Sequence, residues 1–284
     1  MKLIHISDIH INPEPVCGLD PVENFRRCLA HVEVNHADAD RVVITGDLTH
    51  HGREESYRLL AAMLEASSLK GDAAPRLLIG NHDNRKTYAT VFPATPRDAN
   101  GFIQWTEETP AGTFIYMDST EPGTHAGHYC AARRAWLDRQ LCAARDAGKG
   151  AWLFLHHNPI AVHIANADQI GIVQERELQE LLAAHRDTVR HIFFGHCHYT
   201  LSGSAVGIPF SAPRSTNHTC WPDFTGNPNR MGYGELQPNY NVCFLKGDDV
   251  VIHSIDFLDE EKVRWEETND KGWVTEPSAA AQAE

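Results

Sequence analysis

The stretch RLLIGNHDN (residues 76–84) joins a short apolar run to a Gly-Asn-His-Asp cluster. An apolar run that ends in glycine and polar residues is typical of a buried strand followed by a turn. One such cluster has an ordinary explanation as a turn or a helix cap. Several clusters of this kind follow apolar runs along the chain, however, and together they decide how the fold and the chemistry are interpreted.

Apolar runs alternate with amphipathic segments along most of the 284 residues. Strands are predicted at 3–6, 41–46, 76–80, 113–118, 151–155 and 191–195. Helices are predicted at 21–36, 54–67, 131–147 and 174–186. This alternation predicts a layered α/β architecture in which the sheet is largely covered. Later runs at 206–212, 240–245 and 250–256 are expected to complete a second sheet, and 84–112 is expected to form a loop or a small excursion.

Residues that bind metal ions collect where the predicted strands end. The segments are HISDIH (5–10), ITGDLTHHG (44–52), IGNHDN (79–84), FLHHNP (154–159) and FGHCH (194–198). In open α/β sheets, the carboxyl ends of the strands form the edge at which ligands bind. Independent turns do not explain why every cluster lies at that edge, so the sequence favours one shared site.

The candidate metal ligands are Asp8, His10, Asp47, Asn81, His156, His196 and His198. Oxygen and imidazole ligands without thiolate suit two divalent ions drawn from Mn, Fe, Zn and Co. In an extended segment, residues two positions apart project to the same side. His196 and His198 are therefore expected to face the site together, as are Asp8 and His10, which leaves Cys197 on the opposite side.

This series of segments resembles the motifs of the calcineurin-like metallophosphoesterases, which are D-x-H, G-D, G-N-H-[DE], H and G-H-x-H. Here they stand as Asp8-Ile9-His10, Gly46-Asp47, Gly80-Asn81-His82-Asp83, His156 and Gly195-His196-Cys197-His198. The motifs span residues 8–198. The HISDIH, GDLT and HHNP contexts are similar to the class III cyclic-nucleotide and glycerophosphodiester phosphodiesterases. The resemblance implies a β-sandwich flanked by helices, with a dimetal site at the strand ends.

The resemblance also implies a role for each matching residue. One ion is held by Asp8, His10, Asp47 and His198, and the other by Asp47, Asn81, His156 and His196, so that Asp47 bridges them. Mn and Fe are the favoured metals. Asn81 and His82 contact the substrate, and His82 protonates the leaving oxygen or stabilises the transition state while Asp83 orients it. His157 is either a substrate contact or a packed histidine.

The activity implied is hydrolysis of a small phosphodiester, a cyclic nucleotide or a glycerophosphodiester, by a hydroxide held between two metal ions. The alternatives are a phosphomonoesterase acting on a nucleotide or sugar phosphate, and a non-catalytic binding scaffold on the same fold. The formal net charge of −13 argues against a protein that binds nucleic acid polymers through a broad basic surface. A small phosphodiester is therefore the expected partner.

Residues 1–258 are predicted to form a single domain, and the acidic tail 259–284 is expected to be partly disordered. Segment 213–239 carries Trp221, Phe224 and Tyr233 among Pro, Gly and Asn, and is a candidate lid or dimer contact in a homo-oligomer. No apolar run approaches the roughly 18 residues of a membrane span, so no membrane partner is expected. Scattered cysteines without a CxxC pair and no secretory leader favour a cytoplasmic protein.

Overall fold

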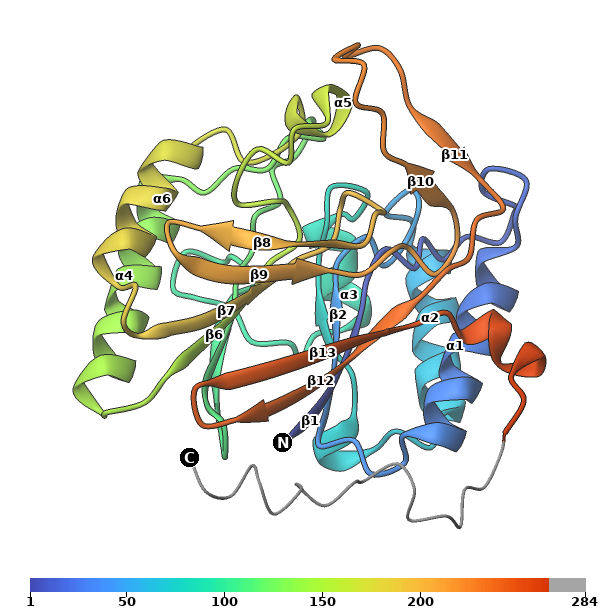
Figure 1. Ribbon diagram of the computed structural model, residues 1–284, viewed down its shortest axis with the longest axis horizontal. Helices are drawn as coiled ribbons and strands as arrows, with labels where there is room; N and C mark the ends of the chain where they lie inside the picture. Colours follow the sequence, from blue (N-terminus) through green and yellow to red (C-terminus); the bar gives the residue numbers. More distant parts are fainter. Residues whose placement is uncertain (266–284) are drawn as a thin grey trace, which may run out of the picture.

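Two β-sheets form the centre of the computed structural model, which describes residues 1–265 (Figure 1). The first sheet has the order β13 (Asp249–Ile255), β12 (Tyr240–Lys246), β1 (Lys2–Ile6), β2 (Arg41–Thr45) and β3 (Arg76–Leu78). The second has the order β4 (Trp105–Thr109), β5 (Gly112–Tyr116), β6 (Ala151–Phe154), β7 (Val189–Phe193), β9 (Ile208–Ala212) and β8 (Leu201–Ala205). The chain is therefore a two-sheet α/β protein, as predicted.

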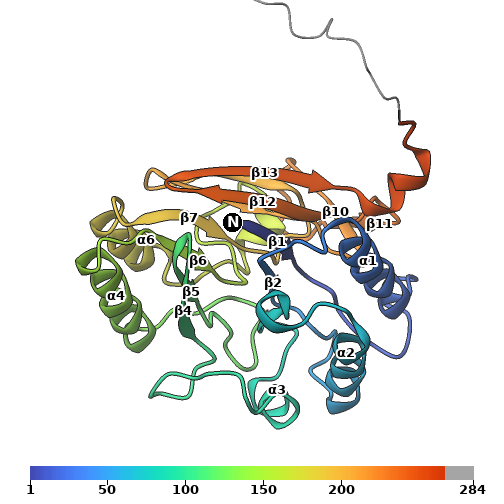
Figure 2. The same ribbon diagram turned by 90° about the horizontal axis from the view of Figure 1, so that it is seen from below.

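Apolar side chains from both sheets meet between them, because strands such as β2 and β6 are buried along their whole length. Val43, Phe114, Trp152 and Phe193 belong to this inner core. Helices α1 (Pro21–Asn35), α2 (Glu54–Ala66) and α3 (Arg85–Val91) cover the first sheet, and α4 (Ala131–Asp146) and α6 (Glu175–Ala184) cover the second (Figure 2). The layers are helix, sheet, sheet and helix, and both sheets are buried on at least part of their outer face.

The predicted strands and long helices agree with the observed ones to within a few residues. Two expectations are wrong. Segment 84–112, expected to be a loop or a small excursion, contains the helix α3 and the strand β4. The runs at 240–245 and 250–256, expected in a second sheet, form β12 and β13 of the first sheet, where β12 pairs antiparallel with β1. Apolar patterning predicts that a strand exists, but it does not say which strand edge will accept it.

The remaining elements are short. A hairpin of β10 (Thr219–Trp221) and β11 (Gly232–Gly234) lies within segment 213–239; in Figure 1 its strands lie to the right of α5 (Ala165–Asp168), and the loop between them reaches the top of the view. The 3-10 helices are η1 (Gly71–Ala73) and η2 (Phe257–Lys262). The predicted tail thus begins within η2, while residues 266–284 lie outside the described part of the chain. Among residues 1–265, no helix is both long and apolar enough to cross a bilayer.

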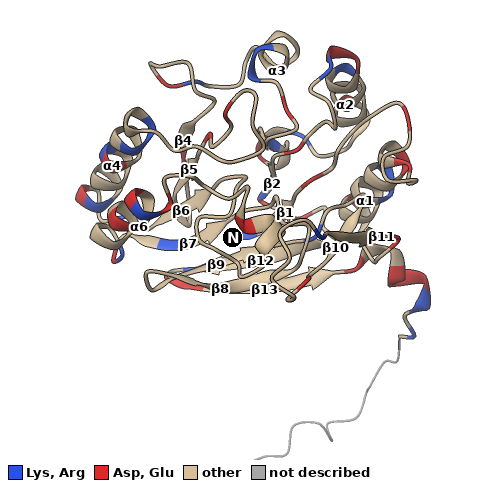
Figure 3. Cartoon of the chain, turned by 90° about the horizontal axis from the view of Figure 1, so that it is seen from above, with Lys and Arg blue, Asp and Glu red and all other residues tan. Residues whose placement is uncertain are grey.

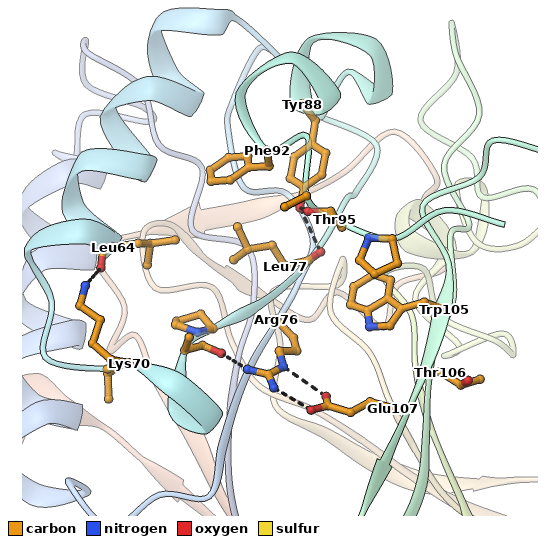
Figure 4. A pocket seen from close by; sticks show the side chains of 15 residues that line it. Leu64, Lys70, Arg76, Leu77, Tyr88, Phe92, Thr95, Trp105, Thr106 and Glu107 are labelled. Atoms are coloured by element: carbon orange, nitrogen blue, oxygen red, sulfur yellow. Dashed lines mark hydrogen bonds and ion pairs between the residues drawn. The ribbon is translucent and has the colours of Figure 1, made fainter.

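Glu107 ties the edges of the two sheets together (Figure 4). Its carboxylate accepts hydrogen bonds from Arg76 on β3 at 2.6 and 3.1 Å, and from Arg41 on β2 at 3.0 Å. Although burial favours the neutral acid, Arg76 and the hydroxyl of Tyr116 hold the pKa of Glu107 below its usual value. Beside this cluster lies a largely apolar cavity of about 530 Å³, lined by Trp105 among others.

His191 on β7 is a buried histidine outside the predicted metal centre. Its Nε2 lies 2.9 Å from Ser211 Oγ, and burial lowers its pKa from 6.5 to about 3. Between these two values the unfolded chain binds a proton that the folded protein does not bind. The contribution to stability is therefore complete above pH 6.5 and is lost as the pH falls towards 3.

His191→Gln is expected to remove this pH dependence. The free energy of unfolding of the metal-free variant should fall less steeply in acid than that of the wild type, by about one proton, on the order of 1 kcal/mol per pH unit. Urea unfolding at several pH values measures both slopes. Equal slopes would mean that His191 is protonated in the folded protein.

Candidate metal centre

Loops that follow β1, β2, β3, β6 and β7 bring the predicted ligands together. A first group consists of Asp8, His10, Asp47 and His198, whose ligand atoms all lie within 4.8 Å of one another. Nε2 of His198 lies 3.2 Å from Asp8 Oδ1 and 3.1 Å from His10 Nε2. All four side chains are buried, so the group forms an enclosed set of oxygen and nitrogen donors.

A second group forms around Asn81. Its Oδ1 lies 3.0 Å from His156 Nε2 and 2.8 Å from His196 Nδ1. His156 Nε2 is also 3.3 Å from Asp47 Oδ1. The structure therefore brings together all the predicted ligands, in the two groups that the resemblance implies.

Asp47 belongs to both groups. Its Oδ1 faces His156, whereas its Oδ2 lies 3.6 Å from His10 Nε2. Burial disfavours the carboxylate, but the neighbouring His156 and His82 keep the pKa of Asp47 well below its usual value. In turn, although burial favours neutral imidazole, Asp47 raises the pKa of His156 to about 9. A carboxylate with one oxygen in each group is suited to bridge two cations.

Backbone carbonyl groups orient the rings of His156 and His198. His156 Nδ1 donates to the carbonyl oxygen of Thr45 and His198 Nδ1 donates to that of His218, both at 2.7 Å. These hydrogen bonds leave the Nε2 lone pairs directed at the site, which is the usual arrangement of metal-binding histidines. Nε2 of His196 is buried without a hydrogen-bond partner among residues 1–265. The donors therefore fit two divalent ions.

The backbone at the ligands differs from the expectation. Asp8, His10, His196 and His198 are expected in extended segments, but their φ angles are +55°, +48°, +66° and +56°. Asp47 is also left-handed, with a φ angle of +47°. Paired ligands therefore face the site through left-handed turns after the strands and not through strand alternation. Such conformations cost on the order of 1–3 kcal/mol each and cluster at functional sites. Several such residues gathered around one group of side chains are typical of a functional site.

Three motif glycines let the loops approach one another. A Cβ on Gly46 would lie 2.5 Å from His156 Nδ1, and one on Gly80 would lie 2.2 Å from Asp47 Oδ1. A Cβ on Gly195 would lie 1.8 Å from Ser7 Oγ. Real Cβ atoms essentially never come so close to other heavy atoms. The glycines are therefore required by the packing of the ligand loops.

His82 lies at the open side of the site, with 26% of its side chain exposed. Its Nδ1 donates to the carbonyl oxygen of His50 at 2.9 Å, and its Nε2 lies 4.0 Å from Asp47 Oδ2. The carboxylate of Asp83 instead accepts hydrogen bonds from the Leu48 amide at 2.9 Å and the Tyr57 hydroxyl at 2.8 Å. Asp83 therefore holds the loop that carries Asp47, and a carbonyl group orients His82, contrary to the expected role of Asp83.

His157 lies behind the ligands. Its Nδ1 is 2.7 Å from Ser119 Oγ and its Nε2 is 3.2 Å from the carbonyl oxygen of His125, and the whole side chain is buried. Burial, together with the neighbouring His196 and His156, lowers its pKa well below the usual value. Of the two interpretations left open by the sequence, this environment supports a packed histidine and not a substrate contact.

Sequence reasoning missed several histidines at the site. His50 stacks on His82 with ring centroids 5.0 Å apart, His218 lies 4.7 Å from the ring of His10, and Nδ1 of His125 lies 2.8 Å from Asn81 Nδ2. These residues and Met231 line a cavity of about 380 Å³ at the predicted ligands. His50 directly follows the GDLT context, but His125 and His218 follow no motif, and their only sequence signal is the high number of histidines, 18 in all.

Cys197 is expected to be dispensable, although it lies between two predicted ligands. Its side chain is 4% exposed and belongs to the apolar core that covers the second sheet. Cys197→Ser is expected to retain metal content and activity while losing about 1–3 kcal/mol of stability, because a hydroxyl group replaces a buried thiol. Metal analysis and urea unfolding test this. Loss of metal from the folded variant would make Cys197 a ligand.

Proteins of similar sequence align with most of this chain. A protein of Rhodopseudomonas palustris named "Probable cyclic nucleotide phosphodiesterase" is 34% identical, over 91% of this chain and 93% of its own length. The cAMP/cGMP dual specificity phosphodiesterase of Mycobacterium tuberculosis is 29% identical, over 76% of this chain and 68% of its own. A dimetal phosphatase of Danio rerio has a similar fold, with a TM-score of 0.66 and 14% identity over 89% of this chain and 95% of its own.

The family model described as calcineurin-like phosphoesterase matches residues 1–200. That range contains all the residues of both ligand groups, and a likeness over more than half of the chain reaches well beyond the motifs themselves. This protein belongs to the calcineurin-like phosphoesterase family.

Proposed function

We propose that this protein is a metal-dependent phosphodiesterase that hydrolyses a small phosphodiester, either a cyclic nucleotide or a glycerophosphodiester. The observation that carries the proposal is the position of Asp47, with one carboxylate oxygen 3.6 Å from His10 Nε2 and the other 3.3 Å from His156 Nε2. This geometry supports two ions that share one carboxylate, as dinuclear phosphoesterase chemistry requires.

One ion would be held by Asp8, His10, Asp47 and His198, and the other by Asp47, Asn81, His156 and His196. Two divalent ions, for which Mn and Fe are favoured, supply a hydroxide nucleophile and neutralise the charge of the phosphoryl group when they are bound. The net charge of −13 repels anions from the surface as a whole, so the attraction for the substrate must be local.

His82 is the proposed proton donor. Because Nδ1 is committed to the carbonyl oxygen of His50, Nε2 is the nitrogen that remains for the substrate. Cleavage of a phosphodiester expels an alkoxide, which a positioned acid can protonate as the bond breaks. Asn81 stands beside it at the second ion and is the other proposed contact to the phosphoryl group. His157 makes no contact of this kind, because both of its ring nitrogens bind protein groups.

The preference for a diester comes from the relatives. The chain is 34% identical to the Rhodopseudomonas palustris protein named "Probable cyclic nucleotide phosphodiesterase". It is 26% identical, over 70% of this chain and 72% of its own length, to an Arcobacter nitrofigilis protein named "Probable glycerophosphodiester phosphodiesterase". The two ligand groups alone would bind a phosphoryl group, but they do not distinguish a phosphodiester from a phosphomonoester.

Paired chromogenic substrates test the proposal. Metal-stripped protein with added Mn²⁺ is expected to hydrolyse bis(4-nitrophenyl) phosphate faster than 4-nitrophenyl phosphate, and a chelator should abolish both reactions. A much faster reaction with the monoester would instead make the protein a phosphomonoesterase. Protein that binds metal but hydrolyses neither ester would be a binding scaffold.

The proposed assembly, compartment and domain limits stay predictions. Trp221, Phe224 and Tyr233 are exposed on the β10–β11 hairpin, and Met231 lines the cavity at the metal centre. Asn166 and Gln169 donate to the carbonyl oxygen of Pro228 at 3.2 and 2.8 Å and hold the hairpin against the neighbouring segment. These features support a lid or a contact in a homo-oligomer. Free cysteines throughout are compatible with the cytoplasm.

A further inference from the structure

Helices α4 and α6 lie side by side over the second sheet (Figure 1), and three side chains of types that can bind a metal ion come together there. Asp138 and Cys142 are one turn apart on α4 and therefore lie on the same helix face. His185 ends α6 and faces them. A carboxylate oxygen of Asp138, Sγ of Cys142 and a ring nitrogen of His185 all lie within 4.8 Å of one another.

One side of the cluster is buried in the protein, and the other side is exposed to solvent. His185 is 6% exposed and its Nε2 lies 2.7 Å from Asp138 Oδ1. Its Nδ1 is buried without a hydrogen-bond partner in the described part of the chain. Cys142 is half-buried, whereas the side chain of Asp138 is 51% exposed. Nε2 of His185 is the ring nitrogen that faces Asp138, so His185 and Cys142 can approach an ion from the protein side and Asp138 from the exposed side, where water can occupy a fourth position.

We propose that Asp138, Cys142 and His185 form a third metal site, which binds Zn²⁺ or a similar divalent ion. Thiolate, imidazole and carboxylate with one water match tetrahedral zinc. From the usual zinc–ligand distances, donor atoms in such a site lie roughly 3.3–3.8 Å apart. To hold an ion, His185 Nε2 and Asp138 Oδ1, now 2.7 Å apart, would move apart, and the more distant donor atoms, which lie within 4.8 Å, would draw together by on the order of 1 Å.

Binding replaces the proton of the Cys142 thiol by the metal and releases that proton to solvent. The ion would link α4 to α6, the two helices that cover the second sheet. The ligand type separates this site from the first one, because the predicted ligands of the dinuclear centre include no thiolate. The proposal is independent of the proposed phosphodiesterase activity, and no catalytic step involves the third ion.

Cobalt substitution tests the site directly. Metal-stripped protein titrated with Co²⁺ is expected to develop the near-ultraviolet charge-transfer band of a thiolate–cobalt bond. Cys142→Ser should lose the band and bind one Co²⁺ fewer per chain, with unchanged Mn²⁺-supported turnover. Cys130→Ser, which changes the half-buried cysteine at the start of the same helix, should keep the band. Asp138→Asn should need a higher Co²⁺ concentration to reach half of the band.

Two outcomes would overturn the proposal. One is the absence of a thiolate band in the wild type when Co²⁺ is in excess. The other is a band that persists in Cys142→Ser, which would assign the thiolate to another cysteine such as Cys17 or Cys220 beside the first centre. Protection of Cys142 from alkylation by Zn²⁺, mapped by peptide mass, gives a second readout if the serine variant folds poorly.

Discussion

Asp47→Asn is expected to lower kcat/KM for the diester substrate by more than about 100-fold, since changes to residues behind the ligands alone cost 10–100-fold. The amide keeps the shape of the side chain but removes its negative charge. Because Asp47 faces both His10 and His156, one substitution weakens both ligand groups at once. Metal analysis should find less than the full complement of bound Mn²⁺.

Thermal unfolding separates loss of metal from loss of fold. A ligand that binds only the folded state raises the melting temperature, so Mn²⁺ should stabilise the wild-type protein. Asp47→Asn should stay folded, but Mn²⁺ should raise its melting temperature much less. Asp146→Asn changes an exposed aspartate on α4 and should behave as the wild type in both assays. Full activity and normal metal content in Asp47→Asn would refute the bridging role.

Much of this site could be predicted from the sequence because its ligands follow strands. An apolar run that ends in Asp, Asn or His predicts both a buried strand and the edge at which it ends. Asp8, Asp47 and His196 each stand within three residues of the end of a strand, and the structure brings them together with the other predicted ligands. The strand patterning therefore carried information about three-dimensional position.

The parts that could not be predicted depend on contacts between distant segments. The side chain of His218 reaches the site from the irregular segment before β10, where no periodicity marks it. The left-handed backbone at His10 and His198, with φ angles of +48° and +56°, is set by the loops that surround it, because positive φ is uncommon in non-glycine residues and the residue type alone does not predict it. Asp83 has the residue type expected from the motif, but only its hydrogen bonds reveal that it holds the loop of Asp47.

Gly80→Ala is expected to lower kcat/KM by about 100-fold or more, although glycine contacts neither metal nor substrate. The added Cβ would lie 2.5 Å from the backbone nitrogen of Asp47 and 2.7 Å from His156 Nε2. A backbone atom cannot rotate away as a flexible side chain can, so the loop of Asp47 must shift. A misplacement of about 1 Å at a reacting group can cost 10²-fold in rate.

Gly234→Ala is the matched control, because a Cβ at that position meets no atom within 4 Å and its backbone is not left-handed either. Both variants should show the far-ultraviolet circular dichroism of the wild type, while only Gly80→Ala loses activity and binds Mn²⁺ more weakly. If Gly80→Ala were as active as Gly234→Ala, the close packing of the β2 and β3 loops would not be required for catalysis. Glycine is needed at residue 80 because a side chain would collide with Asp47 and His156. Gly80→Val, which adds a larger side chain, should therefore be still less active than Gly80→Ala.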